Sequence, residues 1–292
     1  MRLVGIWNGG LSDENVEEQA NSNLHVMKFL GLSMEEDVPD HSVLSRFRSA
    51  LTKASAWDEL LEEINTQLSS DNVTSGHHVD ASITHSPRAP NTKPGYEVVS
   101  DREERDDEAQ AKTDMQVVEA QQPGVDHEAR WLKKAGKSVF GYKQHTMVDD
   151  NGLVDALITT AANQHDSIPF IELVDKAQLP KGSRVHTDKA YDSQKHDTAL
   201  KERGIKNGIQ DKAVKNKLLT KRQRQRNKKI SKVRFVVERT FGSQVRWFHS
   251  KVLRDKSIDK AHAWHVLLAI GYHLKRLPVL FVKTFLQPSC AQ

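Results

Sequence analysis

The sequence lacks the features that mark secreted and membrane-bound proteins. Its 292 residues include one cysteine, Cys290, which excludes a disulfide framework and a cysteine-based zinc cluster. No apolar run approaches the ~20 residues that a membrane helix needs. Residues 1–12 also lack the basic and then apolar pattern of a signal peptide. We therefore expect a protein of the reducing cytoplasm without a membrane partner.

Charge is nearly balanced over the whole chain but is distributed unevenly along it. The formal net charge is +4. Residues 1–79 carry 5 basic and 13 acidic side chains, residues 97–128 carry 3 and 11, and residues 201–250 carry 16 and 3. So large a basic excess in one segment predicts a polyanionic partner, and nucleic acid is the leading candidate.

Residues 1–75 are predicted to form a small helical unit. Ser12 and Asp40 have the side chains and the positions of helix N-caps. Apolar residues recur at helical spacing over 43–51 and again over 57–68. The unit is acidic on balance.

From residue 76 the pattern becomes that of a mixed sheet. Residues 77–83 alternate, with Val79 facing one side and Asp80 the other, as in a strand with one buried face. The runs 139–148 and 153–160 are separated by Asp-Asp-Asn-Gly, a hairpin signal. A helix capped by Asp166 is expected next, followed by a strand at 182–188, a helix ended by Gly204 and a strand at 205–209. Strands alternating with helices predict a mixed sheet with helices on its faces.

The remaining segments have simpler interpretations. Residues 86–128, rich in proline and then in acidic residues, are predicted to be a long, poorly ordered insertion. A long amphipathic helix should begin near Lys228, with an apolar stripe of Ile230, Val233, Val237, Phe241, Val245 and Phe248. A last helix is expected over 260–276, and 278–292 should be a tail. Trp131 and Trp247 are expected to pack in the core, although stacking on unpaired bases is the alternative.

Three carboxylates are candidates for a metal site. Asp80 lies within a strand, Asp188 ends another strand, and Glu238 lies at the edge of the apolar stripe of the long helix. Carboxylate oxygens at strand ends suit Mg²⁺, and two such ions can support phosphodiester chemistry. Spacing alone leaves this open, because a chain with 39 acidic residues contains many such triplets.

Several blocks of the sequence, in order, resemble one known family. They are 79–83 (VDASI), 129–134 (ARWLKK) with 140–145 (FGYKQH), 159–166 (TTAANQHD), 187–193 (TDKAYDS), and 230–234 (ISKVR) with 237–242 (VERTFG) and 246–248 (RWF). Together they span roughly residues 76–277. They resemble the DDE transposases of bacterial insertion sequences, most closely the family typified by insertion sequence five.

The resemblance implies a fold, an activity and a set of site residues. The fold would be an RNase H-like α/β domain over 76–277, with a mixed five-stranded sheet flanked by helices. The family's two Asp and one Glu match Asp80, Asp188 and Glu238, which would bind Mg²⁺ or Mn²⁺, two ions in all. The enzyme would cleave double-stranded DNA at terminal inverted repeats and join the 3′ hydroxyl to target DNA, as a nucleoid-associated homodimer.

Other residues receive supporting roles. Arg234 matches the family's Arg four residues before the Glu, and Tyr191 matches its aromatic after the second Asp. Tyr191 and His165 are expected to border the site. DNA contacts are predicted for Arg222, Arg224, Arg226, Lys228, Lys229, Lys232, Arg234, Arg239 and Arg246. The histidines His77, His78, His145, His165 and His186 lack zinc-ligand spacing apart from the adjacent pair, and we expect them to be hydrogen-bonded instead.

The chain also departs from the family pattern. Ser231 stands where a Tyr is usual, Val245 where a Lys is usual, and Ala190 where a Gly is common. Family members usually carry a longer, more basic stretch before the helical unit, so a shortened copy is a second expectation. Two alternatives to a transposase therefore stay open: a truncated, non-catalytic DNA-binding protein, and a nuclease that cuts branched DNA without joining ends.

Overall fold

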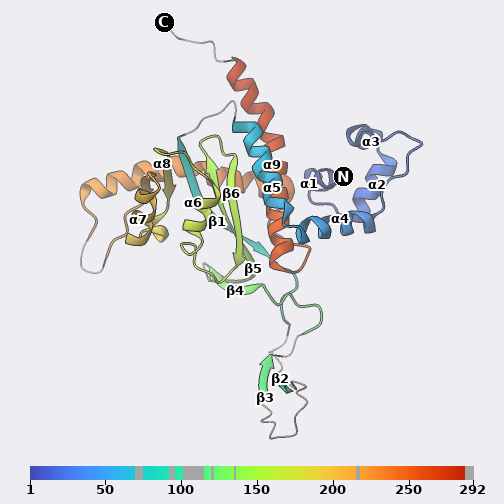
Figure 1. Ribbon diagram of the computed structural model, residues 1–292, viewed down its shortest axis with the longest axis horizontal. Coiled ribbons are helices and arrows are strands. Elements are labelled where there is room, and N and C mark those ends of the chain that lie inside the picture. Colours follow the sequence, from blue (N-terminus) through green and yellow to red (C-terminus); the bar gives the residue numbers. More distant parts are fainter. Residues whose placement is uncertain are drawn as a thin grey trace, which may run out of the picture.

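A computed structural model describes residues 1–69, 75–91, 96–100, 115–119, 122–134, 136–214 and 218–286 (Figure 1). The helical unit consists of α1 (Arg2–Trp7), α2 (Asp13–Ser22), α3 (Leu24–Leu30), α4 (His41–Lys53) and α5 (Ala56–Ser69). Both predicted caps are confirmed. The Ser12 hydroxyl accepts a hydrogen bond from the Asn15 backbone at 3.2 Å, and the Asp40 carboxylate accepts one from the Val43 backbone at 2.8 Å.

The rest of the chain is built on a six-stranded sheet. Its strands are β1 (Gly76–His85), β4 (Arg130–Lys134), β5 (Lys137–Asp149), β6 (Val154–Ala161), β7 (Arg184–Thr187) and β8 (Lys206–Ile209). The order is β6-β5-β1-β7-β8, in which β1, β7 and β8 are parallel and β5 is antiparallel to both of its neighbours. This mixed sheet, with helices on its faces, is consistent with an RNase H-like domain. The sixth strand, β4, was not predicted, and it pairs with the first half of β5 on the edge that β6 occupies further along.

Helices cover the sheet on both faces. Helices α6 (Phe170–Lys176) and α7 (Gln194–Glu202) pack on one face, around a core that includes Val79 and Val185. Helices α8 (Lys221–Phe248) and α9 (Ile258–Leu286) cover the other face, where a second core includes Val237 and Leu268. In Figure 1, α8 and α9 run in different directions over the sheet. No helix in the described ranges has both the length and the apolarity to cross a bilayer.

Two helices differ from their predictions. Helix α6 begins at Phe170, its N-cap is Pro169, and Ile168 is 63% exposed. Asp166 therefore does not cap it. Helix α8 begins at Lys221, so the basic run belongs to the helix, and a capping box of Thr220 and Gln223 closes its first turn. Its expected stripe is wrong at Val233, which is 39% exposed, because the helix turns the Arg234 side towards the sheet instead.

The insertion and the tail also differ from expectation. Within 86–128, β2 (Tyr96–Ser100) and β3 (Met115–Glu119) pair as an antiparallel ribbon that lies apart from the main sheet (Figure 1). The rest of the acidic run, 101–114, lies outside the described residues. Helix α9 continues through Pro278 to Leu286, so residues 278–286 are helical rather than a tail. Residues 287–292 lie outside the described part.

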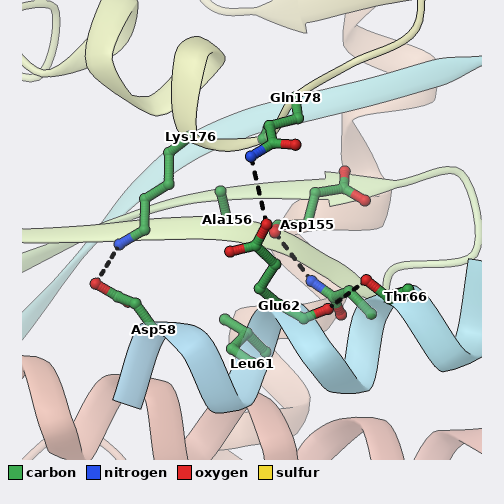
Figure 2. Close-up of a pocket in the computed structure, with 10 residues that line it drawn as sticks. Asp58, Leu61, Glu62, Thr66, Asp155, Ala156, Lys176 and Gln178 are labelled. Atoms are coloured by element: carbon green, nitrogen blue, oxygen red, sulfur yellow. Dashed lines mark hydrogen bonds and ion pairs between the residues drawn. The ribbon is translucent and has the colours of Figure 1, made fainter. Parts of the chain in front are cut away.

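The helical unit is joined to the sheet through α5. A cavity of about 320 Å³ lies between α5 and the sheet, and pairs of side chains interact across it (Figure 2). Asp58 accepts from Lys176 at 2.8 Å and is 2.9 Å from the His262 ring nitrogen, while Gln178 donates to Glu62 at 3.3 Å. Trp57 and Leu61 of α5 are buried against α9. The helical unit and the sheet therefore share one core.

Candidate active site

The register of two parallel strands brings Asp80 and Asp188 together. Strands β1 and β7 are paired up to His78 and His186, whose rings stack with centroids 5.1 Å apart. Asp80 and Asp188 each follow two residues later, and side chains two residues apart point to the same face. Because neighbouring strands lie about 4.8 Å apart, the two carboxylates emerge side by side on the face covered by α8.

Local hydrogen bonds orient both aspartates. The Asp188 carboxylate accepts from the Ala190 backbone at 2.8 Å and so caps the short 3₁₀ helix Lys189–Tyr191. The Asp80 carboxylate accepts from the Ala81 backbone at 2.8 Å. Each of these hydrogen bonds engages one oxygen of its carboxylate.

Helix α8 supplies an arginine and a glutamate to the same place. The Arg234 guanidinium, in a residue only 8% exposed, lies 3.1 Å from the second oxygen of Asp80. Glu238 follows one turn later on the same side of the helix and is exposed. Burial raises the pKa of Asp80, Arg234 opposes that rise, and the charges of Asp188 and Glu238 add to it. The three predicted carboxylates therefore act on one another electrostatically.

The donor set fits a hard divalent cation. Asp80, Asp188 and Glu238 would supply carboxylate oxygens, the ligands that Mg²⁺ and Mn²⁺ prefer. In the described part of the chain, however, no three acidic, histidine or cysteine side chains are arranged to enclose an ion as they stand. The positive group next to Asp80 is Arg234. Binding of the predicted ions by this triad therefore stays a prediction.

Tyr191 borders this group of carboxylates. Its side chain is 2% exposed and its ring packs edge-on against Phe170, with centroids 5.4 Å apart. Burial, and then the charges of Asp80, Asp166 and Asp188, raise the pKa of its hydroxyl well above the ordinary value. That hydroxyl has no hydrogen-bond partner among the described residues. It therefore lies in the field of the carboxylates, as its position after Asp188 suggested.

Asp166 and Lys143 form an ion pair that the sequence did not reveal. Lys143 is 7% exposed, and its ammonium lies 2.7 Å from Asp166 and donates to the Gln164 carbonyl at 2.6 Å. This pair holds the loop after β6 against β5. His165 of the same loop is exposed, and its ring lies 2.8 Å from the Ser167 hydroxyl, so its predicted place at the border of the site stays a prediction. The only sequence signal for the pair was that both residues lie in family blocks.

The predicted DNA-binding residues divide into two groups. Six are exposed on α8: Arg222, Arg224, Lys228, Lys229, Lys232 and Arg246. Three are engaged within the protein. Arg226 binds Asp211 at 3.0 Å and the Ile209 carbonyl at 2.6 Å, Arg239 donates to the Asn151 carbonyl at 2.9 Å, and Arg234 pairs with Asp80.

The two tryptophans behave differently. Trp247 packs in the core against Tyr272, as expected. Trp131 is 51% exposed, so the expectation of core packing is wrong there. The buried histidines are hydrogen-bonded or in ring contact, as His77 with Asp155 at 2.8 Å and His78 with Asp150 at 2.9 Å illustrate.

Comparison with protein families gives two matches along the chain. The family described as "Transposase DDE domain" matches residues 112–274. The chain belongs to this family of insertion-element transposases. A second family, described as "Transposase domain (DUF772)", matches residues 1–50, within the helical unit. No solved structure matches the chain.

Two curated transposases are similar to this chain over part of their length. The transposase for insertion sequence element IS1106 of Neisseria meningitidis serogroup B is 37% identical over 207 residues, which are 70% of this chain and 66% of that protein. The putative transposase for insertion sequence element IS402 of Burkholderia cepacia is 32% identical over 141 residues, 45% of this chain and 60% of that protein. The match thus spans just under two thirds of either relative.

Proposed function

We propose that this protein is the transposase of an insertion sequence, which cleaves double-stranded DNA at the element's inverted repeats and joins the 3′ hydroxyl to target DNA. One observation carries the proposal. The parallel register that ends at His78 and His186 sets Asp80 beside Asp188, beneath the helix that carries Glu238. This is the carboxylate set that the DDE family name denotes. We further propose that the active complex is a homodimer.

The three carboxylates would hold Mg²⁺ or Mn²⁺, and the bound ions would supply Lewis-acid activation of the attacking and leaving oxygens. The chain's own groups have separate tasks. Hydrogen bonds from Ala190 and Ala81 fix the orientation of Asp188 and Asp80. Arg234 favours the ionised form of Asp80, which a cation ligand needs. The exposed basic residues of α8 bind the phosphate backbone and hold it over the strand ends.

The test is a strand-transfer reaction with Mg²⁺ on DNA that carries the element's own inverted repeats. Asp188→Asn should abolish cleavage and joining, with DNA binding within about twofold of wild type, because the change removes one ligand charge and keeps the shape. Asp192→Asn is the matched control. It removes a carboxylate four residues away that is exposed and accepts from the Lys212 backbone, and it should retain activity.

Other outcomes would replace the proposal. Wild-type protein that binds the repeats but yields no product supports a truncated, non-catalytic DNA-binding protein. Cleavage of branched DNA without joining supports a nuclease. Loss of DNA binding in Asp188→Asn, with the fold intact, contradicts the role given to Asp188.

A further inference from the structure

An exposed tryptophan lies among basic residues on strand β4. Trp131 is 51% exposed, and its indole rests against the Phe140 ring of β5, with centroids 5.2 Å apart. Around it are the exposed side chains of Arg130, Lys133, Lys134, Lys137 and Lys251. We call these six residues the β4 patch. Four of the six belong to the sequence block 129–134, to which the proposed catalytic chemistry gives no role.

Among the described residues, no acidic side chain neutralises the charges of the β4 patch. None of its basic side chains lies within ion-pair distance of a carboxylate in the described ranges. Arg130 donates to the backbone carbonyls of His127 and Ala129, and Lys251 donates to the Ser82 hydroxyl at 2.9 Å. Burial and then the charge of Lys134 lower the pKa of Lys251. Like charges gathered in this way are stabilised by an external anion.

Trp131 and Lys133 lie on the same sheet face as Asp80, whereas Arg130 and Lys134 point to the other side of this edge strand. Trp131 is opposite Phe140 in the register, and Phe140 alternates along β5 with Thr146, the partner of Asp80. Arg130 is opposite Gly141, which is opposite His85, five residues after Asp80 on β1. Five residues are about 17 Å and two strand spacings are about 10 Å. Arg130 therefore lies about 20 Å from Asp80, or about six base pairs of DNA, and Lys251, bonded to Ser82, lies between them.

We propose that the β4 patch binds unpaired DNA next to the cleavage site, with a base stacked on Trp131 and phosphates bound by the lysines. The inference rests on the proposed function only in taking DNA as the partner. An indole face that is half exposed and held by a second ring is a preformed stacking platform. A base can use such a platform only when it has left the duplex stack, whereas the exposed basic residues of α8 bind phosphates of either form.

The test measures affinity of the full-length chain for labelled DNA by fluorescence anisotropy, without metal. The probes are a single-stranded oligonucleotide of mixed sequence, a blunt duplex, and that duplex with a single-stranded tail. Trp131→Ala should weaken binding to the single strand and to the tailed duplex by about tenfold, with the blunt duplex unchanged within twofold. Trp131→Phe should keep most of the affinity, because its ring can still stack.

A charge variant and its control complete the test. Lys133→Gln/Lys134→Gln/Lys137→Gln should reduce the salt slope for the single strand by about 2, since each phosphate contact contributes about 0.7. Lys195→Gln/Lys201→Gln/Lys206→Gln removes three equally exposed lysines near α7 and should leave the slope unchanged. Thermal unfolding verifies that every variant is folded.

The proposal is overturned if folded Trp131→Ala binds the single strand as wild type does, or loses affinity equally for the blunt duplex. Asp188→Asn separates the two proposals. It should bind the single strand like wild type, so a failure of strand transfer leaves this result intact, and a failure here leaves the carboxylate chemistry intact.

Discussion

The salt dependence of duplex binding follows from how α8 presents its basic residues. Six of the nine predicted contacts are exposed, and three are engaged with the protein. If each exposed residue neutralises one phosphate, the slope of log K against log salt is about −5, from about −0.9 per contact. A fourfold rise in salt, from 50 to 200 mM, should then weaken binding by about a thousandfold.

Single substitutions can distinguish the exposed basic residues of α8 from those that are engaged within the protein. Arg224→Gln should make the slope shallower by about 0.9, because the side chain is exposed on the first turns of α8. Arg226→Gln is the matched control two residues later. Its guanidinium is engaged with Asp211 and the backbone of β8, so the change should lower stability and leave the slope as it was.

Fluorescence anisotropy of a labelled duplex at five or more salt concentrations gives the slope. A slope shallower than about −2 for wild type would refute the reasoning, because it would mean that most of the exposed residues contact no phosphate. An equal effect of Arg224→Gln and Arg226→Gln would refute the division into two groups.

Two further predictions concern stability. Burial, and then the charge of Asp155, raise the pKa of Asp149 to about 6; its unfolded value is about 3.9. Because the pKa of Asp149 is higher in the folded than in the unfolded state, its contribution to stability is fully present below pH 4 and is lost as pH rises through 6. Asp149→Asn should therefore have a free energy of unfolding up to about 3 kcal/mol higher than wild type at pH 8, with no such increase at pH 4. Urea unfolding at both pH values measures the difference. An increase of the same size at both pH values would contradict the prediction. Thr220→Ala removes the N-cap of α8 and should cost about 1 kcal/mol locally; faster hydrogen exchange at 221–225 than in wild type is the expected sign, and unchanged exchange would contradict it.

Much of the architecture was predictable because it depends on local patterns. Alternation identified β1, the Asn-Gly turn identified the hairpin of β5 and β6, and single side chains identified the caps of α2 and α4. The positions of Asp80 within β1 and of Asp188 at the end of β7 were likewise predictable from the sequence pattern. Their adjacency was not, because it depends on which strands are neighbours and in what register.

The errors arise where tertiary contacts override the local pattern. The sequence of β4 is polar because both faces of this edge strand are exposed, so it has no alternation of apolar residues that would predict a strand. Its strand conformation depends on pairing with β5. Arg234 displaces Val233 from the buried side of α8 because Asp80 provides a partner for its charge. Asp166 has the side chain of a helix cap, but a buried lysine from another strand engages it.

Because α8 is uninterrupted, its length fixes the distance between its first turn and Glu238. Seventeen residues separate Lys221 from Glu238 along one uninterrupted helix, which is about 26 Å at 1.5 Å per residue. That span equals seven or eight base-pair steps of DNA at 3.4 Å each. Under the proposed function, a phosphate bound at the start of the helix would be kept at a set number of base pairs from Glu238. The length of α8 would then fix the distance between the point where DNA is bound and the point where it is cut.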